Sequence, residues 1–180
     1  MWRKVVDNGQ QLGAISWGHE VLKYVMGEIM PTGDFAEGPK TWFDVDTVYM
    51  PVNVHQKHWV IAAIDLVGRQ ISIYDSSIAS TTDSFMVEHL RCVSELLPSL
   101  LKEVGFYAHR SELYDSGVAF KTARVHDGVP QQHTSRGDCG VFICKYVEYL
   151  SMQREFDFGP ADGIRLRRNM ALSLWADQLV

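Results

Sequence analysis

The sequence has few features of secreted, membrane or nucleic-acid-binding proteins. Its three cysteines are too few, and odd in number, for a disulfide framework, which favours a reducing intracellular compartment. No apolar run approaches the roughly 18 residues of a membrane span, and the N-terminal stretch MWRKVVDNGQQ has no apolar signal core. Acidic residues outnumber basic ones by 22 to 17, which argues against nucleic acid as a partner and for a partner with a basic patch.

The composition is that of a globular domain. Hydrophobic residues make up 46% and charged residues 22% of the chain, which excludes disordered and fibrous classes. We find no internal repeat, no low-complexity tract and no glycine-rich phosphate loop. We therefore expect residues 1–180 to form one domain with a buried core.

Periodicity in the hydrophobic residues predicts both helices and strands. The helices are expected over 16–29, 85–104, 139–152 and 161–178, and the strands over 45–54, 59–66, 71–76 and 117–125. Asp83 or Ser84 is a plausible N-cap, and Pro98 is expected to kink or split the helix that follows. Strands in the middle of the chain with helices on both sides predict an α+β domain with a mostly antiparallel sheet.

Cys139 lies in a segment whose pattern is typical of a helix start. The GDCG residues favour a turn, and the following VFICKYVEYL favours a buried helix, so Cys139 is expected in its first turn. Unpaired N–H groups and the positive end of the helix dipole favour a thiolate at that place. Gln131 and Gln132, eight and seven residues upstream, offer amide donors. Taken alone, however, a cysteine at a helix start is more often structural.

His58 and Asp75 are expected to face each other across a hairpin. They lie 17 positions apart, and their midpoint near Val67 and Gly68 is where the chain must turn. Cross-strand neighbours lie roughly 5 Å apart at Cβ, which allows an imidazole–carboxylate hydrogen bond. Asp75 would then hold one ring nitrogen and leave the other for a thiol, as in a thiol hydrolase.

Simpler roles exist for each of these residues taken singly. His58 could be a strand-end histidine, Asp75 could cap a turn, and the two glutamines could be loop residues. Their combination favours the catalytic interpretation. A metal site built from the set His55, His58, His133 and Cys139 lacks ligands at a recognisable spacing, so no metal or other cofactor is expected. The two remaining cysteines, Cys92 and Cys144, are expected in the core.

In these segments the chain resembles the ubiquitin-like-protein-specific cysteine proteases, the SUMO protease family, in its divergent plant and transposon-linked form. The resemblance covers about Trp42 to Leu150 and consists of VDTVYMPVNV, then HW, an apolar strand, YDS and PQQ…DCGVF in that order. It implies the papain-like cysteine protease fold, an α+β architecture, in its adenovirus-protease-like variant.

The resemblance also implies roles for individual residues. The family's catalytic triad would fall on His58, Asp75 and Cys139, and its oxyanion glutamine on Gln132. The aromatic side chain that flanks the narrow tunnel for a Gly-Gly tail would be Trp59.

Two departures from the family pattern concern substrate capture more than the triad. The glutamine usually lies six positions before the cysteine, whereas Gln132 lies seven before Cys139. The upstream tryptophan segment that forms the other wall of the tunnel is not recognisable, although Trp17 could substitute for it. The N-terminal part, about residues 1–41, therefore looks shortened or rearranged.

The resemblance implies a cysteine peptidase that cleaves after the C-terminal glycine of a ubiquitin-like modifier, as a deSUMOylating isopeptidase or endopeptidase. Its partners would be the modifier and its conjugates, with no nucleic acid and no membrane, and the protein is expected to be a monomer. A nuclear location is implied by the resemblance only. Two alternatives remain open: a catalytically impaired binder of ubiquitin-like proteins, and an acyltransferase that uses the same Cys-His-Asp set.

Overall fold

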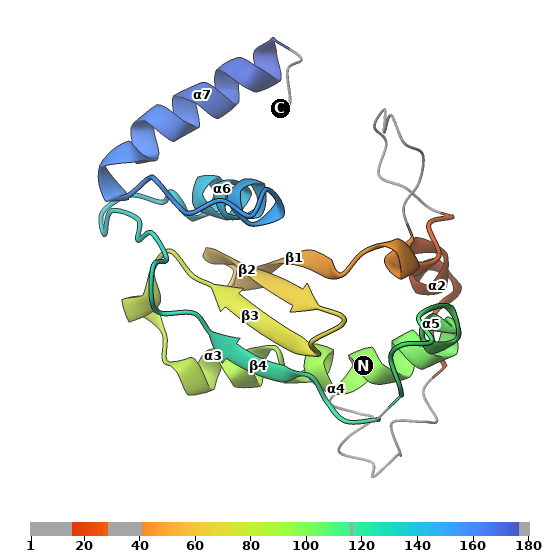
Figure 1. Ribbon diagram of the computed structural model, residues 1–180. Helices are drawn as coiled ribbons and strands as arrows, with labels where there is room; N and C mark the ends of the chain where they lie inside the picture. Colours follow the sequence, from red (N-terminus) through yellow and green to blue (C-terminus); the bar gives the residue numbers. More distant parts are fainter. Residues whose placement is uncertain (1–15, 29–40, 116, 177–180) are drawn as a thin grey trace. The chain divides into compact units, whose positions relative to one another are not determined.

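The computed structural model describes residues 16–28, 41–115 and 117–176 (Figure 1). The helices within these ranges are α2 (His19–Val25), α3 (Asp83–His89), α4 (Arg91–Glu103), α5 (Phe106–His109), α6 (Cys139–Ser151) and α7 (Gly163–Trp175). The strands are β1 (Thr47–Val54), β2 (His58–Asp65), β3 (Gln70–Tyr74) and β4 (Lys121–Arg124). None of the helices in these ranges has the length and apolar character that crossing a bilayer requires.

The four strands form one sheet in the order β1-β2-β3-β4 (Figure 1). The strand β1 lies at an edge, where the exposed Pro51 needs no partner for its missing N–H. The strand β4 runs parallel to β3, because Lys121 N–H donates to the Arg69 carbonyl at 3.0 Å and Val125 N–H donates to the Ile73 carbonyl at 2.9 Å. A parallel pair needs a long crossover connection, which α3, α4 and α5 supply here. The predicted α+β class is confirmed, with one parallel pair in the sheet.

The turn between β2 and β3 lies where the spacing of His58 and Asp75 predicted it. The carboxylate of Asp65 accepts the N–H groups of Val67 at 3.0 Å and of Gly68 at 2.8 Å. A Cβ atom at Gly68 would lie 2.3 Å from Asp65 Oδ2, so a side chain there would force the carboxylate that holds this turn to move.

The helix predicted over 85–104 is divided at Leu90 and not at Pro98. Leu90 has φ −96° and ψ 2°, and it separates α3 from α4. Pro98 lies inside α4 and is buried. Its missing N–H would leave the Ser94 carbonyl without its helical donor, but Phe120 N–H donates to that carbonyl at 3.0 Å. The expected split at Pro98 is therefore wrong, because a distant backbone group supplies the lost hydrogen bond.

The chain divides into two compact units. The first contains the described parts of Met1–Val48 with Ile64–Ile71 and Glu88–Thr122, and the second contains Tyr49–Ala63, Ser72–Val87 and the described part of Ala123–Val180. In the first unit, Phe43 of the 3-10 turn Trp42–Asp44 stacks on His109 with ring centroids 4.3 Å apart. The expectation of one domain over 1–180 stays a prediction, and much of its N-terminal part, 1–15 and 29–40, lies outside the described residues.

Aromatic packing fixes α6 within the second unit. Phe142, Tyr146 and Tyr149 project from α6 into a core that includes Ile61 of β2 and Phe158. The rings of Phe142 and Phe158 meet edge to face with centroids 5.4 Å apart. Since such close packing leaves little freedom, the start of α6 is held firmly against the sheet segment of this unit.

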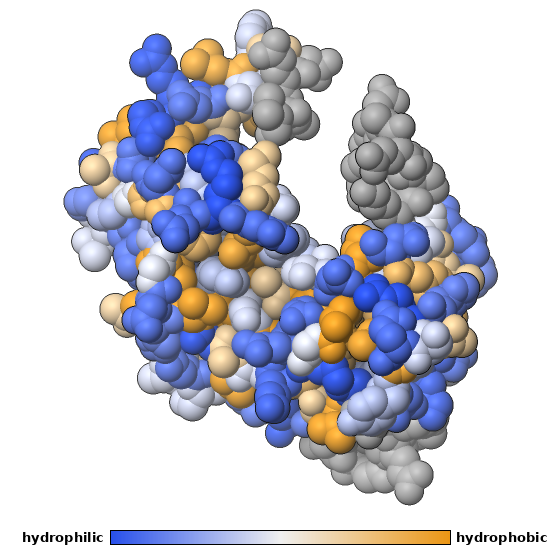
Figure 2. Space-filling model, viewed as in Figure 1, coloured by the Kyte–Doolittle hydropathy of each residue, from blue (hydrophilic) through white to orange (hydrophobic). Residues whose placement is uncertain are grey.

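The following helix α7 keeps several apolar side chains in solvent. The exposed large residues on α7 are Ile164, Leu172, Leu174 and Trp175. Figure 2 shows hydrophobic and hydrophilic residues interspersed over the face in view. Residues 177 and 178 of the helix predicted over 161–178 lie outside the described residues.

Candidate active site

The predicted pairing of His58 and Asp75 is present. His58 is the first residue of β2, and Asp75 directly follows β3. The His58 Nε2 atom lies 2.7 Å from Asp75 Oδ1. Since Nε2 is held by the carboxylate, Nδ1 is the ring nitrogen that this arrangement leaves for a thiol.

Asp75 is held as a carboxylate although it is fully buried. Its Oδ1 also accepts the Ser77 N–H at 2.8 Å, and its Oδ2 accepts a hydrogen bond from Arg124 Nη1 at 3.1 Å. Burial by itself raises the pKa of Asp75, but the hydrogen bonds from His58 and Ser77 and the nearby positive charges outweigh it, so the pKa lies below its ordinary value. A negative charge is therefore available to orient and stabilise the imidazole.

Cys139 begins α6, as the sequence predicted. Its side chain is nearly buried, with 8% of the residue exposed. The N–H of Phe142 donates to the Asp138 carbonyl at 3.0 Å, so the N–H groups of the first turn before it have no helical acceptor. Asp138 itself is ion-paired to Arg167 of α7, which ties this helix start to the next helix. The pairing of the Cys139 thiol with the His58 ring stays a prediction.

The side chains of Gln131 and Gln132 form different hydrogen bonds. Gln131 uses its whole side chain locally: Nε2 donates to the carbonyls of Asp75 at 2.9 Å and Val129 at 3.2 Å, and Oε1 accepts the Ile78 N–H at 3.0 Å. Gln132 donates its backbone N–H to the Ser76 carbonyl at 2.7 Å.

The side chain of Gln132 is held from its oxygen end. Its Oε1 accepts the Ser76 hydroxyl at 3.2 Å. The Nε2 group of Gln132 makes no hydrogen bond to any residue that the structure describes. This geometry favours Gln132 over Gln131 as a donor to a bound group.

The loop between Gln132 and Cys139 contains a turn. Arg136 N–H donates to the His133 carbonyl at 3.1 Å, and Ser135 Oγ lies 2.9 Å from His133 Nδ1. The turn follows Gln132, whose backbone N–H donates to the Ser76 carbonyl.

Other residues singled out in the sequence occupy varied positions. Trp59, the second residue of β2, directly follows His58 in the sequence and is 40% exposed. Trp17 belongs to the first unit, and the sequence-based substitution of Trp17 for a tunnel wall stays a prediction. Among the described residues, no group of three or more His, Cys, Asp or Glu side chains is arranged to hold a metal.

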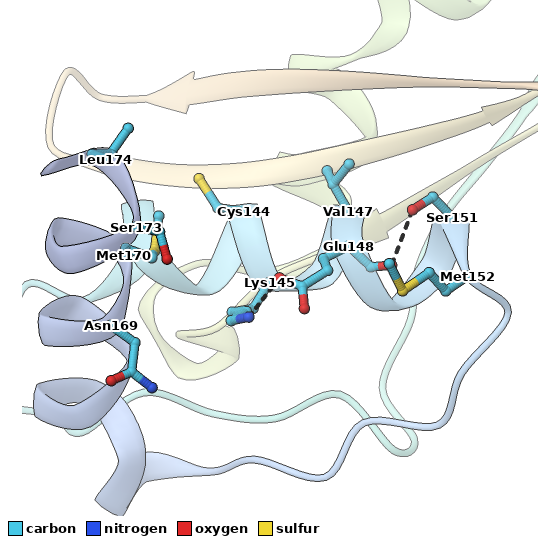
Figure 3. Close-up of a pocket in the computed structure, with 10 residues that line it drawn as sticks. All are labelled: Cys144, Lys145, Val147, Glu148, Ser151, Met152, Asn169, Met170, Ser173 and Leu174. Carbon is cyan, nitrogen blue, oxygen red and sulfur yellow. Dashed lines mark hydrogen bonds and ion pairs between the residues drawn. The ribbon is translucent and has the colours of Figure 1, made fainter. Parts of the chain in front are cut away.

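The core position expected for Cys144 is wrong. Cys144 is exposed and lines a cavity of about 490 Å³ between α6 and α7 (Figure 3). It lies five residues beyond Cys139, on the side of α6 that lines this cavity. The cavity contains none of the predicted site residues, so it is separate from the candidate active site.

Sequence reasoning missed two residues that shape this site. Ser76 holds both the backbone and the side chain of Gln132, and Arg124 binds the second oxygen of Asp75. Ser76 could have been noticed from its place beside Asp75 in the YDS segment. Arg124 gives no such signal, because a single arginine in the KTARV strand pattern is ordinarily solvated.

Comparisons with known proteins point to one protein family. The profile of the Ulp1 protease family, C-terminal catalytic domain, matches residues 27–176. Ubiquitin-like-specific protease 1 of Saccharomyces cerevisiae is 30% identical over 142 residues, which are 78% of this chain and 20% of that protein. Sentrin-specific protease 5 of Homo sapiens is 28% identical over 139 residues, which are 74% of this chain and 16% of that protein. The chain therefore spans a small part of the length of these relatives.

Solved structures give the same fold. The X-ray structure of the C-terminal Ulp1 protease domain in complex with Smt3, the yeast ortholog of SUMO, matches with a TM-score of 0.54 and 25% identity, over 76% of this chain and 55% of that one. A structure of the SUMO protease Ulp1 with its catalytic cysteine oxidized to a sulfonic acid matches with a TM-score of 0.55 at 23% identity, over 76% of this chain and 56% of that one. With a family profile that covers the hairpin, the glutamine loop and the cysteine helix, the chain belongs to the Ulp1 protease family.

Proposed function

We propose that this chain is a catalytic part of a cysteine protease that cleaves after the C-terminal glycine of a ubiquitin-like modifier. The observation that carries the proposal is the 2.7 Å hydrogen bond between His58 and the buried Asp75, in a chain of the Ulp1 family. Because a Ulp1 domain has been crystallised with Smt3, a SUMO-type modifier is the first substrate to test.

The first half of the reaction would use Cys139 as the nucleophile. His58 takes the thiol proton on Nδ1 while Asp75 holds Nε2–H, and the helix start stabilises the negative charge of the thiolate. The sulfur forms a bond to the carbonyl carbon of the terminal glycine, and the carbonyl oxygen becomes an oxyanion. The Cys139 N–H and Gln132 Nε2 donate to that oxygen.

The second half would release both products. The C–N bond breaks as His58 gives its proton to the leaving amine, which leaves a thioester on Cys139. Water then loses a proton to His58 and attacks the thioester carbon, and the C–S bond breaks as the thiol is re-formed. Trp59 packs over the extended tail, where only glycine leaves room for the approach.

The test is covalent capture by modifiers that carry a C-terminal electrophile. We expect a SUMO-type probe to add one modifier mass to the protein, with the adduct mapped to Cys139. Cys139→Ser should abolish the adduct. The matched control is Cys144→Ser, which removes an exposed thiol five residues away on the same helix and should leave labelling unchanged.

The outcomes separate the candidate functions. Tight binding of the modifier without an adduct would indicate a non-catalytic binder, and labelling by acetyl-coenzyme A instead would indicate an acyltransferase. Cleavage of a modifier precursor by Cys139→Ser at the parental rate would defeat the protease assignment.

The remaining expectations are also part of this proposal. The protein would act inside the cell on an intracellular modifier. A nuclear location rests on the family resemblance alone. Fluorescence of a tagged chain tests the location. Size-exclusion chromatography with light scattering tests the expected monomer.

A further inference from the structure

Arg124, the last residue of β4, has an unusually buried side chain. Its side chain is 0% exposed, whereas arginine is almost never fully buried unless it is paired. Nη1 donates to Asp75 Oδ2 at 3.1 Å and to the Ile78 carbonyl at 2.8 Å, and Nη2 donates to the Thr81 carbonyl at 2.7 Å. Nε lies 3.0 Å from Asp83 Oδ1, an ion-pair distance without hydrogen-bond alignment.

These contacts divide the two oxygens of Asp75 between different partners. Oδ1 is hydrogen-bonded to His58 Nε2 and accepts the Ser77 N–H, while Oδ2 accepts a hydrogen bond from Arg124 Nη1. A carboxylate that is bonded on both oxygens cannot rotate about its Cβ–Cγ bond without breaking one set of bonds. The planar guanidinium is itself fixed by two backbone carbonyls, so it is a rigid support for that orientation.

We propose that Arg124 is a positioning residue of the active site, which acts through Asp75 by fixing the plane of the carboxylate so that Oδ1 faces His58. It touches neither substrate nor nucleophile. The inference rests on the proposed function, because an oriented His58 matters only if that ring moves a proton.

Asp75 is surrounded by charged or titratable groups from three elements. These groups are His58 from β2, Arg124 from β4 and Tyr146 from α6, with Asp83 and His126 behind Arg124 as an ion pair of 2.7 Å. Burial and the charge of Asp75 raise the pKa of Tyr146 far above its ordinary value, so that phenol stays neutral. Arg124 supplies a permanent positive charge to this set. Its removal would let Asp75 take up a proton at a higher pH.

Two substitutions separate the charge of Arg124 from its shape. Arg124→Gln removes both and should lower kcat by about tenfold to a hundredfold, less than the roughly 10⁴-fold that loss of a triad carboxylate costs. Its activity should also begin to fall at a higher pH on the acid side, while KM for a modifier precursor stays unchanged. Arg124→Lys keeps the charge, so the pH at which activity falls on the acid side of the profile should return to the parental value. Its kcat should stay several-fold below the parental value, because an ammonium group cannot bond to Asp75 and the two backbone carbonyls in the geometry of the guanidinium.

The control is Arg165→Gln, on an exposed arginine of α7 paired to Asp162, which should leave kcat and the pH profile unchanged. A readout without substrate is the rate at which iodoacetamide alkylates Cys139 at each pH, measured by peptide mass in proteins that also carry Cys144→Ser, because Cys144 is an exposed thiol five residues away. Slower alkylation at acidic pH in Arg124→Gln is expected. If the parental chain cleaves no modifier but this shift is present, the proposed function fails and the positioning role stands.

A folded Arg124→Gln protein with parental kcat and parental pH profiles for cleavage and alkylation would overturn the inference. Thermal melting establishes whether each variant folds. If Arg124→Gln does not fold, Arg124→Lys decides instead, and parental kcat in that variant would overturn the role.

Discussion

Two adjacent glutamines provide a test of how this site divides catalysis from stability. Gln132→Ala removes the proposed oxyanion donor, and the loss of one such donor costs about 10²–10³ in kcat, or roughly 3 kcal/mol. In the folded state it removes only the hydrogen bond from Ser76 to its Oε1, worth about 1 kcal/mol. We therefore expect a large loss of kcat with a small change in melting temperature.

Gln131→Ala should show the reverse. The substitution leaves the carbonyls of Asp75 and Val129 and the N–H of Ile78 without their partner, and each unsatisfied group costs about 1–3 kcal/mol when buried. Gln131 itself is half-buried, so water can reach part of the space that its side chain leaves, and we expect a total of about 2–3 kcal/mol. At about 2–4 °C per kcal/mol for a chain of this size, the melting temperature should fall by roughly 5–10 °C.

The assays are kcat on a modifier precursor and thermal unfolding followed by circular dichroism. Gln132→Glu is a useful companion, because it keeps the size and the acceptor of the side chain but replaces the donor by a negative group. It should be at least as inactive as Gln132→Ala while it melts near the parental temperature. If Gln131→Ala lowers kcat without changing the melting temperature, and Gln132→Ala keeps the parental kcat, the assignment of the two amides is refuted.

Three further substitutions test single features of the structure. Asp75→Asn should lower kcat by roughly 10⁴-fold. The pKa of Asp75 is lower in the folded than in the unfolded protein, so its charge stabilises the fold at any pH above the unfolded-state pKa, and this stabilisation is lost as the pH falls through the folded-state pKa. The melting temperature of Asp75→Asn, which lacks this charge, should therefore vary less with acidic pH than that of the parent. Gly163→Ala should lower the melting temperature, since the new Cβ would lie 2.3 Å from Asp138 Oδ2. Gly68→Ala should do so as well, since its Cβ would meet Asp65 Oδ2 at 2.3 Å and disturb the β2–β3 turn.

Two glycines with free space around them are controls for these substitutions. A Cβ atom at Gly18 or Gly159 would meet no atom within 4 Å, so alanine there should change the melting temperature little. Equal destabilisation at all four glycines would show that the close approaches to Asp65 and Asp138 are not what matters. A melting temperature of Asp75→Asn that follows the parental pH dependence would contradict the stabilising charge on Asp75.

The local features of the site could be predicted because they depend on neighbours in sequence. The hairpin around Gly68 has a spacing that places His58 opposite Asp75, and the apolar run after Cys139 starts a helix at that residue. Hydrophobic periodicity and turn chemistry are both local properties, so a sequence records them directly.

The continuity of α4 through Pro98 could not be predicted in the same way. Pro98 removes one donor, and that is a local fact which argues for a break there. The compensating donor is the N–H of Phe120, which lies in the extended segment before β4. Because Phe120 lies more than twenty residues away, no sequence pattern around Pro98 reveals that the hydrogen bond lost at Pro98 is replaced.

The direction of β4 explains why Arg124 was missed. In an antiparallel pair, the end of β4 would lie beside the beginning of β3, far from Asp75. The bonds from Lys121 to Arg69 and from Val125 to Ile73 make the pair parallel, so both strands end at the same edge of the sheet. That edge is where β3 delivers Asp75, and only there can the last side chain of β4 reach its carboxylate. The direction of a strand after a crossover of three helices is a non-local property, and the contact of Arg124 with the Asp75 carboxylate depends on it.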